Sequence, residues 1–287
     1  MISIVALCRN SSSLKSLSQN IQDTSASKVE FIGIDNTLNL YDIPAAYNRG
    51  ISQTTGDILC FVHDDVQFVM SGWDEIIENS FKQIPNIGVL GCAGGTKFCN
   101  APSSWWTKRM ESEIHMSHLG ADGSASGQLF ANPKKVIGID GFILVVRKEH
   151  VINDFKWSSI IGHFHGYDLD LCLHMCLTLG LSNFVLPQTI IQHNSLGSNN
   201  IDWAHSMIRI WKKYYRGLSE MNGNKVDVEA LFFFIGMTKE WSEIKLSLCR
   251  CAKELGFSEL FIFGIRMQYS GSKIFRSVGS RVLRIFA

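Results

Sequence analysis

The sequence predicts an α/β fold in which helices flank a mostly parallel central sheet, followed by a helical C-terminal appendage. Short β-rich runs alternate with polar or helical stretches over the first hundred residues, which is typical of βαβ units. The expected strands are almost continuously apolar, which indicates a sheet covered on both faces. In chain order, the expected elements of this part are 2–7, 14–21, 29–34, 44–54, 57–62, 73–84 and 87–91.

The chain is less regular from residue 100 onward. Residues 100–134 lose the periodicity and contain Trp105 and Trp106, which suits a long excursion over the sheet that orders on binding as a lid. Core packing is the alternative for both tryptophans, and we favour it slightly. The remaining elements are expected as strands at 140–147 and 183–192 and as helical patterns at 168–179, 201–215 and 226–235.

The composition excludes several classes of protein. With 287 residues, of which 46% are hydrophobic and 18% charged, the chain can bury a full core, so intrinsic disorder and fibrous repeats are excluded. A net charge of +1 at pH 7 provides no basic field, so no nucleic-acid partner is expected. The apolar runs are shorter than the roughly 18 residues that cross a bilayer. Eight scattered cysteines and an N-terminus without the features of a secretion signal predict a cytoplasmic protein.

The strongest local signal is the run His63-Asp64-Asp65 at the end of the strand expected at 57–62. Ligands collect at the carboxyl ends of the strands in such sheets. Carboxylates there suit Mg²⁺ or Mn²⁺, ions that also bind substrate phosphates. A turn or a helix N-cap is the structural alternative for the two acids.

The second signal is a glycine-containing turn that leads into a helix with Asp168 and Asp170 in its first turn. The positive end of the helix dipole is expected to keep both carboxylates ionised, and an ionised carboxylate can act as a general base. Because two acids are present, one can cap the helix while the other faces a cleft.

Two further strand ends carry polar side chains. A lone histidine such as His193 is usually structural, but beside carboxylates it could complete a mixed nitrogen and oxygen site for Mn²⁺. Asp35 ends the strand expected at 29–34, where it could accept hydrogen bonds from a base or a ribose. A turn formed with Asn36 is the alternative.

In this order, the signals resemble the GT-A glycosyltransferases, in particular the family-2-like enzymes that use nucleotide-diphosphate sugars. The resemblance runs from residue 2 to about 197, and residues 46–57 are similar to the family's ARNxG…GD stretch. It implies a Rossmann-like GT-A catalytic domain at 1–218 and a helical extension at 219–287. The nucleotide-binding half would be about 1–100 and the acceptor half about 101–218.

The resemblance also implies roles for single residues. His63-Asp64-Asp65 stands where the family has DxD, which makes Asp65 a ligand of Mn²⁺ or Mg²⁺, and His193 would complete that site. GYDLDL at 166–171 is similar to the family's GEDxDL and makes Asp168 the catalytic base. His63, Tyr47 and Tyr167 depart from the pattern, because the family has an acid, an arginine and a glutamate there. The residues expected to bind the nucleotide sugar are Cys8, Arg9, Asp35, Asn48, Arg49, Asp64, Asp140 and Gly141.

The implied reaction is an inverting transfer. Asp168 would take the proton of an acceptor hydroxyl while the metal neutralises charge on the departing nucleotide diphosphate. A saccharide or a lipid-linked saccharide would accept the sugar, in polysaccharide or glycoconjugate synthesis. Two alternatives stay open: a nucleotidyltransferase or sugar-nucleotide hydrolase, and a non-catalytic sugar-nucleotide or carbohydrate-binding protein, since a fold does not settle function.

The C-terminal segment 264–287 carries five basic residues and no acid. At about 100° per residue, its apolar side chains from Ile274 to Phe286 fall in one arc and the basic ones in the other. Such a helix suits an anionic membrane surface, which would place the protein at the inner face of the membrane. Packing of the same stripe on the catalytic domain, or on a second subunit in a homodimer, is an equal alternative.

Overall fold

The computed structural model describes residues 1–107, 113–127, 130–194 and 199–287. The chain forms two compact units: Met1–Lys97 with Glu113–Gly197, and Phe98–Ser112 with Ser198–Ala287. The first unit contains the central sheet and the second is helical. The boundary predicted at residue 218 falls inside helix α5 (Ile201–Met221).

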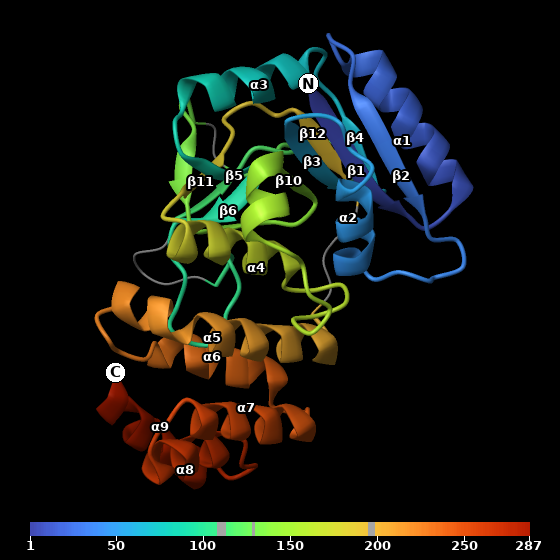
Figure 1. The fold of residues 1–287 in the computed structure, drawn as a ribbon. Coiled ribbons are helices and arrows are strands. Elements are labelled where there is room, and N and C mark those ends of the chain that lie inside the picture. The colour runs from blue at the N-terminus through green and yellow to red at the C-terminus, as the bar shows by residue number, and fades with distance from the viewer. Residues whose placement is uncertain (108–112, 128–129, 195–198) are drawn as a thin grey trace. The chain divides into compact units, whose positions relative to one another are not determined.

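A seven-stranded mixed sheet forms the centre of the first unit (Figure 1). β1 pairs in parallel with β2 and β3, and β11 pairs in parallel with β5. β10 runs antiparallel between β3 and β5, and β8 is an antiparallel edge strand. The α/β fold class is confirmed, and the sheet is mixed. In sheet order, the strands are β2 (Glu30–Asp35), β1 (Ile2–Cys8), β3 (Ile58–His63), β10 (Ile143–Arg147), β5 (Ile87–Gly91), β11 (Ser182–Val185) and β8 (Lys134–Val136).

Two small sheets extend the first unit. The expected strand at 183–192 is divided, since its second part forms β12 (Ile191–His193), which pairs antiparallel with β4 (Val66–Phe68). The other small sheet contains β7, β6 and β9 in that order. Their bounds are Ile114–Met116, Ala93–Gly95 and Gly138–Ile139.

Four helices cover the central sheet. Each of α1 and α2 begins at a side-chain cap: Asn10 accepts a hydrogen bond from the amide of Ser13, and Asp42 from that of Ala45. A cap of this kind is worth about 1 kcal/mol. The bounds are α1 Ser11–Thr24, α2 Ile43–Ile51, α3 Trp73–Gln83 and α4 Tyr167–Leu173, with single π-helical turns at His150–Asp154 and His174–Thr178.

The core of the first unit depends on close contact between helix and strand. Side chains of α2 and α4 share one buried cluster with alternate residues of β1, β3 and β10. A Cβ atom on Gly50 of α2 would lie 2.2 Å from Cγ1 of Val5 on β1. Only a glycine therefore lets this helix approach the strand so closely, and α2 is held directly on the sheet.

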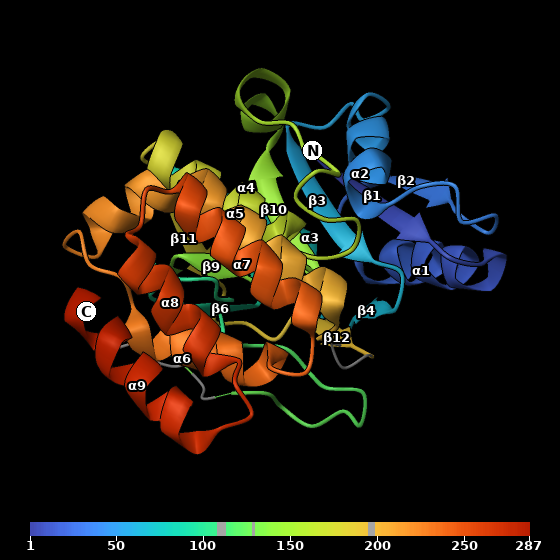
Figure 2. The same ribbon diagram turned by 90° about the horizontal axis from the view of Figure 1, so that it is seen from below.

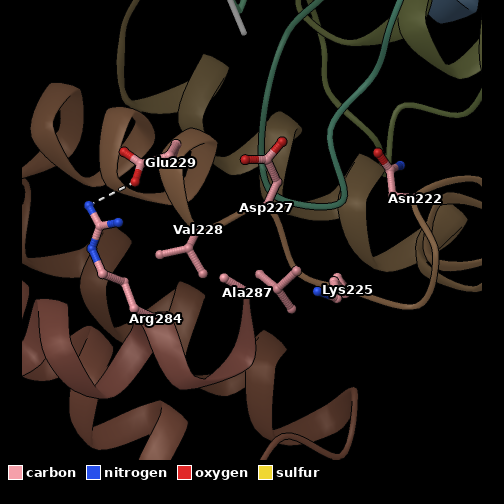
Figure 3. A pocket seen from close by; sticks show the side chains of 8 residues that line it. Asn222, Lys225, Asp227, Val228, Glu229, Arg284 and Ala287 are labelled. Atoms are coloured by element: carbon pink, nitrogen blue, oxygen red, sulfur yellow. Dashed lines mark ion pairs between the residues drawn. The ribbon is translucent and has the colours of Figure 1, made fainter. Parts of the chain in front are cut away.

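The second unit contains α5, α6 (Val228–Thr238), α7 (Ser242–Glu254), α8 (Glu259–Gln268) and α9 (Lys273–Leu283), and a 3₁₀ turn at Arg284–Phe286. The ion pair of Arg284 with Glu229, at 2.8 Å, connects the last turn to α6 beside a pocket (Figure 3). None of the helices in the described ranges is long and apolar enough to cross a membrane.

The tryptophans of the expected excursion pack in this helical unit. Trp105 is buried, and the ring of Trp106 stacks on that of Trp203 at 6.0 Å between centroids. Asn100 accepts a hydrogen bond from the indole of Trp211 at 3.1 Å. Both tryptophans therefore pack in a core, as the favoured alternative predicted. Residues 108–112 and 128–129 of the expected lid lie outside the described residues.

Candidate metal and active site

Three side chains with metal-binding atoms meet at the ends of β3 and β12. The β4–β12 pairing places His193 opposite Val66, next to Asp65 in the chain. Oδ1 of Asp65 lies 3.6 Å from Nε2 of His193 and 4.0 Å from Nδ1 of His63. One potential ligand atom from each residue lies within 4.8 Å of the other two, and no other such group occurs among the described residues. The structure therefore brings the predicted pair Asp65 and His193 together and adds His63.

The donor set fits a divalent transition-metal ion. Two atoms that each lie about 2.1 Å from one ion are roughly 3 to 4.2 Å apart, a range that includes the two distances from Asp65. The side chains are 28%, 19% and 12% exposed for His63, Asp65 and His193, so the site is recessed but open to solvent on one side. Two imidazoles with one carboxylate favour Mn²⁺ and related ions over Mg²⁺, which prefers oxygen.

His63 was not predicted as a ligand from the sequence, where it stands only as a departure from an acidic motif. Burial, followed by the nearby His193, lowers the pKa of His63 to about 4, although the charges of Asp65 and Asp64 act in the opposite direction. The imidazole is therefore neutral at pH 7, the form that binds a metal. The sequence signal that could have identified this site is that His63 and His193 each end a strand and that Asp65 follows the first of them.

Tyr167 connects this cluster to helix α4. Its hydroxyl lies 2.6 Å from Nε2 of His63. A Cβ atom on Gly141 would lie 2.1 Å from that hydroxyl oxygen, so this position, two residues before β10, must be glycine for the tyrosine to reach the histidine. Burial raises the pKa of Tyr167 well above its ordinary value, and the charges of Asp168, Asp140 and Asp65 add to the rise. Three predicted acids from distant parts of the chain thus act on one hydroxyl.

Asp168, next to Tyr167 in the first turn of α4, is the candidate base. Burial, followed by the negative charge of Asp140, raises its pKa to about 7, while the amide of Leu169 donates to Oδ1 at 2.8 Å. The helix dipole was expected to keep Asp168 ionised, but burial and Asp140 act against it, so the carboxyl is only partly ionised at neutral pH. A carboxyl that titrates near neutral pH can both accept and release a proton.

Three consecutive residues at the start of β10 contact separate parts of the site. Asp140 acts electrostatically on Asp168, and Gly141 makes room for Tyr167. The ring of Phe142 stacks on that of His193 at 4.7 Å, and its carbonyl accepts a hydrogen bond from the amide of His63. The segment 140–142 therefore supports both the metal cluster and the candidate base.

Asp64 holds Arg9 at the end of β1. The buried carboxylate accepts hydrogen bonds from the backbone amide of Arg9 at 2.8 Å and from its Nε at 2.9 Å. Nη2 of Arg9 lies 2.7 Å from Asp64 and 3.7 Å from Oδ2 of Asp65. The exposed guanidinium is thus positioned beside the metal cluster, where a phosphate group could bind.

The other predicted nucleotide-binding residues have local contacts. Cys8 is fully buried, and burial raises the pKa of its thiol to about 12. Asp35 is exposed and accepts a hydrogen bond from the amide of Thr37, which lowers its pKa. The turn that was the alternative for Asp35 therefore forms. Cys8 and Asp35 are register partners at the ends of β1 and β2.

Helix α2 supplies the rest of the predicted set. Asn48 donates to the carbonyl of Trp157 at 2.8 Å. The guanidinium of Arg49 lies over the ring of Tyr41, 5.7 Å from its centroid. Tyr47 is buried and packs against Phe61, Trp157 and Tyr167. None of these contacts is with the three residues of the metal cluster.

Comparisons with known proteins agree with this architecture. A family model described as "Glycosyltransferase like family" matches residues 4–188. A search of curated proteins found no significant match. Among solved structures, S. aureus TarS residues 1–349 in complex with UDP-GlcNAc is 10% identical, with a TM-score of 0.52 over 99% of this chain and 89% of that one.

Two other solved structures are similar over about half of their own length. S. aureus TarS is 10% identical, with a TM-score of 0.56 over 99% of this chain and 55% of that one. GalNAc-T7 with UDP, GalNAc and Mn²⁺ is 10% identical, with a TM-score of 0.51 over 75% of this chain and 49% of that one. At this identity the likeness shows a common fold.

Proposed function

Because the chain belongs to this glycosyltransferase-like family, we propose that it transfers a sugar from a nucleotide-diphosphate sugar to an acceptor hydroxyl. The observation that carries the proposal is the meeting of His63, Asp65 and His193 at one sheet edge, linked through Tyr167 to helix α4, which carries Asp168 in its first turn. The similar structures with UDP-GlcNAc, or with UDP and Mn²⁺, support a uridine nucleotide and a metal as first probes.

His63, Asp65 and His193 would hold the metal ion, with Mn²⁺ preferred over Mg²⁺. A divalent ion at this position would supply positive charge that stabilises a nucleotide diphosphate as it leaves. Arg9, which Asp64 orients, would bind a phosphate oxygen of the donor. The exposed Asp35 would accept hydrogen bonds from the nucleoside at the neighbouring strand end.

Asp168 would be the general base. With a pKa of about 7, a large fraction of this carboxyl is ionised at neutral pH, and the acid it forms is weak enough to keep the proton. Attack by the acceptor oxygen on the face opposite the nucleotide inverts the anomeric carbon. Asp140 and Gly141 would border the donor sugar, since they lie beside both Asp168 and Tyr167.

Two of the three departures from the family pattern, His63 and Tyr167, support an enzyme over a non-catalytic binding protein. Nε2 of His63 and the hydroxyl of Tyr167 lie 2.6 Å apart. The two residues therefore replace the family's acids as a contacting pair, and His63 still offers a metal-binding atom. A nucleotidyltransferase would leave Asp168 on α4 without a clear task, whereas a hydrolase would use it to activate water. Analysis of the product therefore separates the hydrolase from the transferase.

We further propose that the protein works in the cytoplasm at the inner face of a membrane, on a saccharide or lipid-linked saccharide in polysaccharide or glycoconjugate synthesis. Helix α9 packs on α8 through Gly279 and Leu283. Its outer apolar side chains, Ile274, Phe275 and Val278, are 73%, 52% and 41% exposed. Among the described residues, the stripe thus packs on α8 of the helical unit and not on the catalytic domain, and its exposed side chains would be open to a bilayer or a second subunit.

The test is a donor screen followed by a product assay. Thermal shifts with UDP-, GDP-, dTDP- and CMP-linked sugars, with and without Mn²⁺, would identify a donor, because a ligand of the native state raises apparent stability. We expect one nucleotide class to stabilise the protein only with the metal. Sugar transfer to a saccharide acceptor would then be measured, and release of free sugar without transfer would identify a hydrolase.

A further inference from the structure

The last three helices and the turn that follows them carry a net positive charge, unlike the rest of the chain. Residues 242–287 contain eight Lys or Arg side chains and three Glu side chains, a net charge of +5, whereas the whole chain carries +1. The remaining residues are therefore net acidic. The positively charged helices α7, α8 and α9 lie side by side in Figure 2. This charge asymmetry makes them the part of the chain that an anionic partner would contact.

A groove of about 370 Å³ lies between α7 and α8. On α7, the lining residues recur at positions i, i+3, i+4 and i+7 and thus share one helix face; on α8 they recur at i, i+3 and i+7. The groove therefore lies between one face of each helix, and its lining contains three cations and one acid, Glu259. It is lined by Leu246, Cys249, Arg250, Lys253, Glu259, Ile262 and Arg266.

Three cations surround this groove without an acid bound to them. Arg250, Lys253 and Arg266 are exposed, and in the part of the chain that the structure describes none of them forms an ion pair. Arg266 lies close enough to the Cys249 thiol to oppose the rise in its pKa that burial causes. Like charges that surround one groove repel each other. An anion bound among them would offset this electrostatic repulsion.

Exposed apolar side chains lie next to the cations. Leu246 lines the groove and is 65% exposed, and Phe263 is 40% exposed on α8. Phe263 precedes Arg266 by three positions, so the two side chains are neighbours on the helix surface. Apolar side chains beside cations suit the boundary between the headgroups and the acyl chains of a bilayer.

The other pocket of the helical unit differs in its charges. In Figure 3, Arg284 is paired with Glu229, and Asp227 lies at the same pocket. Its positive and negative side chains are balanced, so it offers no comparable attraction for an anion.

We propose that the groove between α7 and α8 binds the phosphate of an anionic lipid headgroup, with Leu246 and Phe263 entering the bilayer interface beside it. The proposal rests on the membrane-peripheral part of the proposed function and not on sugar transfer. Arg250, Lys253 and Arg266 are the phosphate-binding residues, because they line the groove and form no ion pair within the described part of the chain.

Sedimentation of the full chain with vesicles tests the proposal, without nucleotide or metal. The vesicles contain either phosphatidylcholine alone or phosphatidylcholine with the anionic phosphatidylglycerol. We expect binding to the second kind only, weakened by salt. Replacing Arg250, Lys253 and Arg266 by Ala should lower the partition coefficient on the order of 100-fold, since each basic residue near an anionic surface contributes about 1 kcal/mol.

The control variant replaces Lys15, Lys28 and Lys156, three exposed cations of the other unit, by Ala. It changes the net charge equally and should bind as the unchanged chain does. Arg250→Lys with Arg266→Lys should retain most of the binding, and Phe263→Ser should weaken it on anionic vesicles. Equal loss in the control variant, or unchanged binding of the groove variant, would overturn the proposal.

Two further outcomes would also overturn it. If inorganic phosphate stabilises the protein in a thermal-shift assay but vesicles do not bind, the groove takes a soluble anion. If the groove variant changes the oligomeric state in light scattering while vesicle binding is unaffected, the face joins two copies of the chain. Failure of the donor screen with normal vesicle binding would reject the transferase function and leave this proposal standing.

Discussion

The hydroxyl of Tyr167 lies 2.6 Å from Nε2 of His63, and this contact leaves Nδ1 of the same ring directed to Asp65 at 4.0 Å. The nitrogen that faces the acid needs a free lone pair to bind a metal, so the proton belongs on Nε2, where Tyr167 accepts it. With a metal on Nδ1, this hydrogen bond holds the ring with Nε2–H donating to Tyr167 and thereby fixes the orientation of His63.

Tyr167→Phe should weaken Mn²⁺ binding about 10- to 100-fold, the usual effect of losing a partner of a metal ligand. Isothermal titration with Mn²⁺ measures this without any turnover. Tyr47→Phe is the matched control, because it removes the same hydroxyl from a ring 5.8 Å away in the same buried cluster. Equal affinities in both variants would show that Tyr167 does not position His63.

Asp168→Asn should lower kcat by about 10²- to 10⁴-fold, the contribution of a positioned base. Donor affinity should change little, because the variant retains the size of the side chain. Single-turnover transfer and donor titration separate the two quantities. A parallel loss of donor binding would mean that Asp168 holds the donor instead of activating the acceptor.

The reaction should depend on pH through the raised pKa of Asp168, about 7. Only the carboxylate accepts a proton, so kcat/KM should rise with pH up to about 7 and level off above it. Asp140→Asn removes a negative charge that raises this pKa. The rising limb should therefore move to lower pH, as measured by pH–rate profiles at saturating metal, and a limb that stays in place would exclude Asp140 as the cause.

His63→Asp should change the choice of metal. The substitution changes the donor set from two nitrogens and one oxygen to one nitrogen and two oxygens. The affinity for Mg²⁺ should therefore approach that for Mn²⁺. The ratio of the two dissociation constants, measured by titration, is the readout. His150→Asp, outside the cluster, should leave the ratio unchanged, and a constant ratio in both variants would remove His63 from the ligand set.

Gly50→Ala should destabilise the fold by about 1 to 3 kcal/mol, the cost of overpacking a full core, because the added Cβ would lie 2.2 Å from Val5. Gly236, within α6, has no atom within 4 Å of the corresponding Cβ position. Gly236→Ala should therefore stabilise by up to about 1 kcal/mol through helix propensity. Urea unfolding of both variants checks the opposite signs.

Local patterns predicted the strands but not their directions. The run at 140–147 was expected as a strand, and β10 forms there, yet a buried strand is equally apolar in either direction. His63 was not predicted as a ligand, because the pairing of β4 with β12 that brings His193 beside it joins residues more than a hundred positions apart. The raised pKa of Asp168 likewise depends on burial and on Asp140, which follows from the tertiary fold alone.

The antiparallel direction of β10 has a consequence for how the site tolerates change. Parallel strands reach this edge of the sheet as they end, whereas β10 reaches it as it begins, so the turn at 140–142 enters the site before the strand is paired. A single residue inserted in that turn would displace Asp140, Gly141 and Phe142 together relative to their three partners. Loop length at this one place is thus constrained as strictly as the identity of any metal-binding side chain.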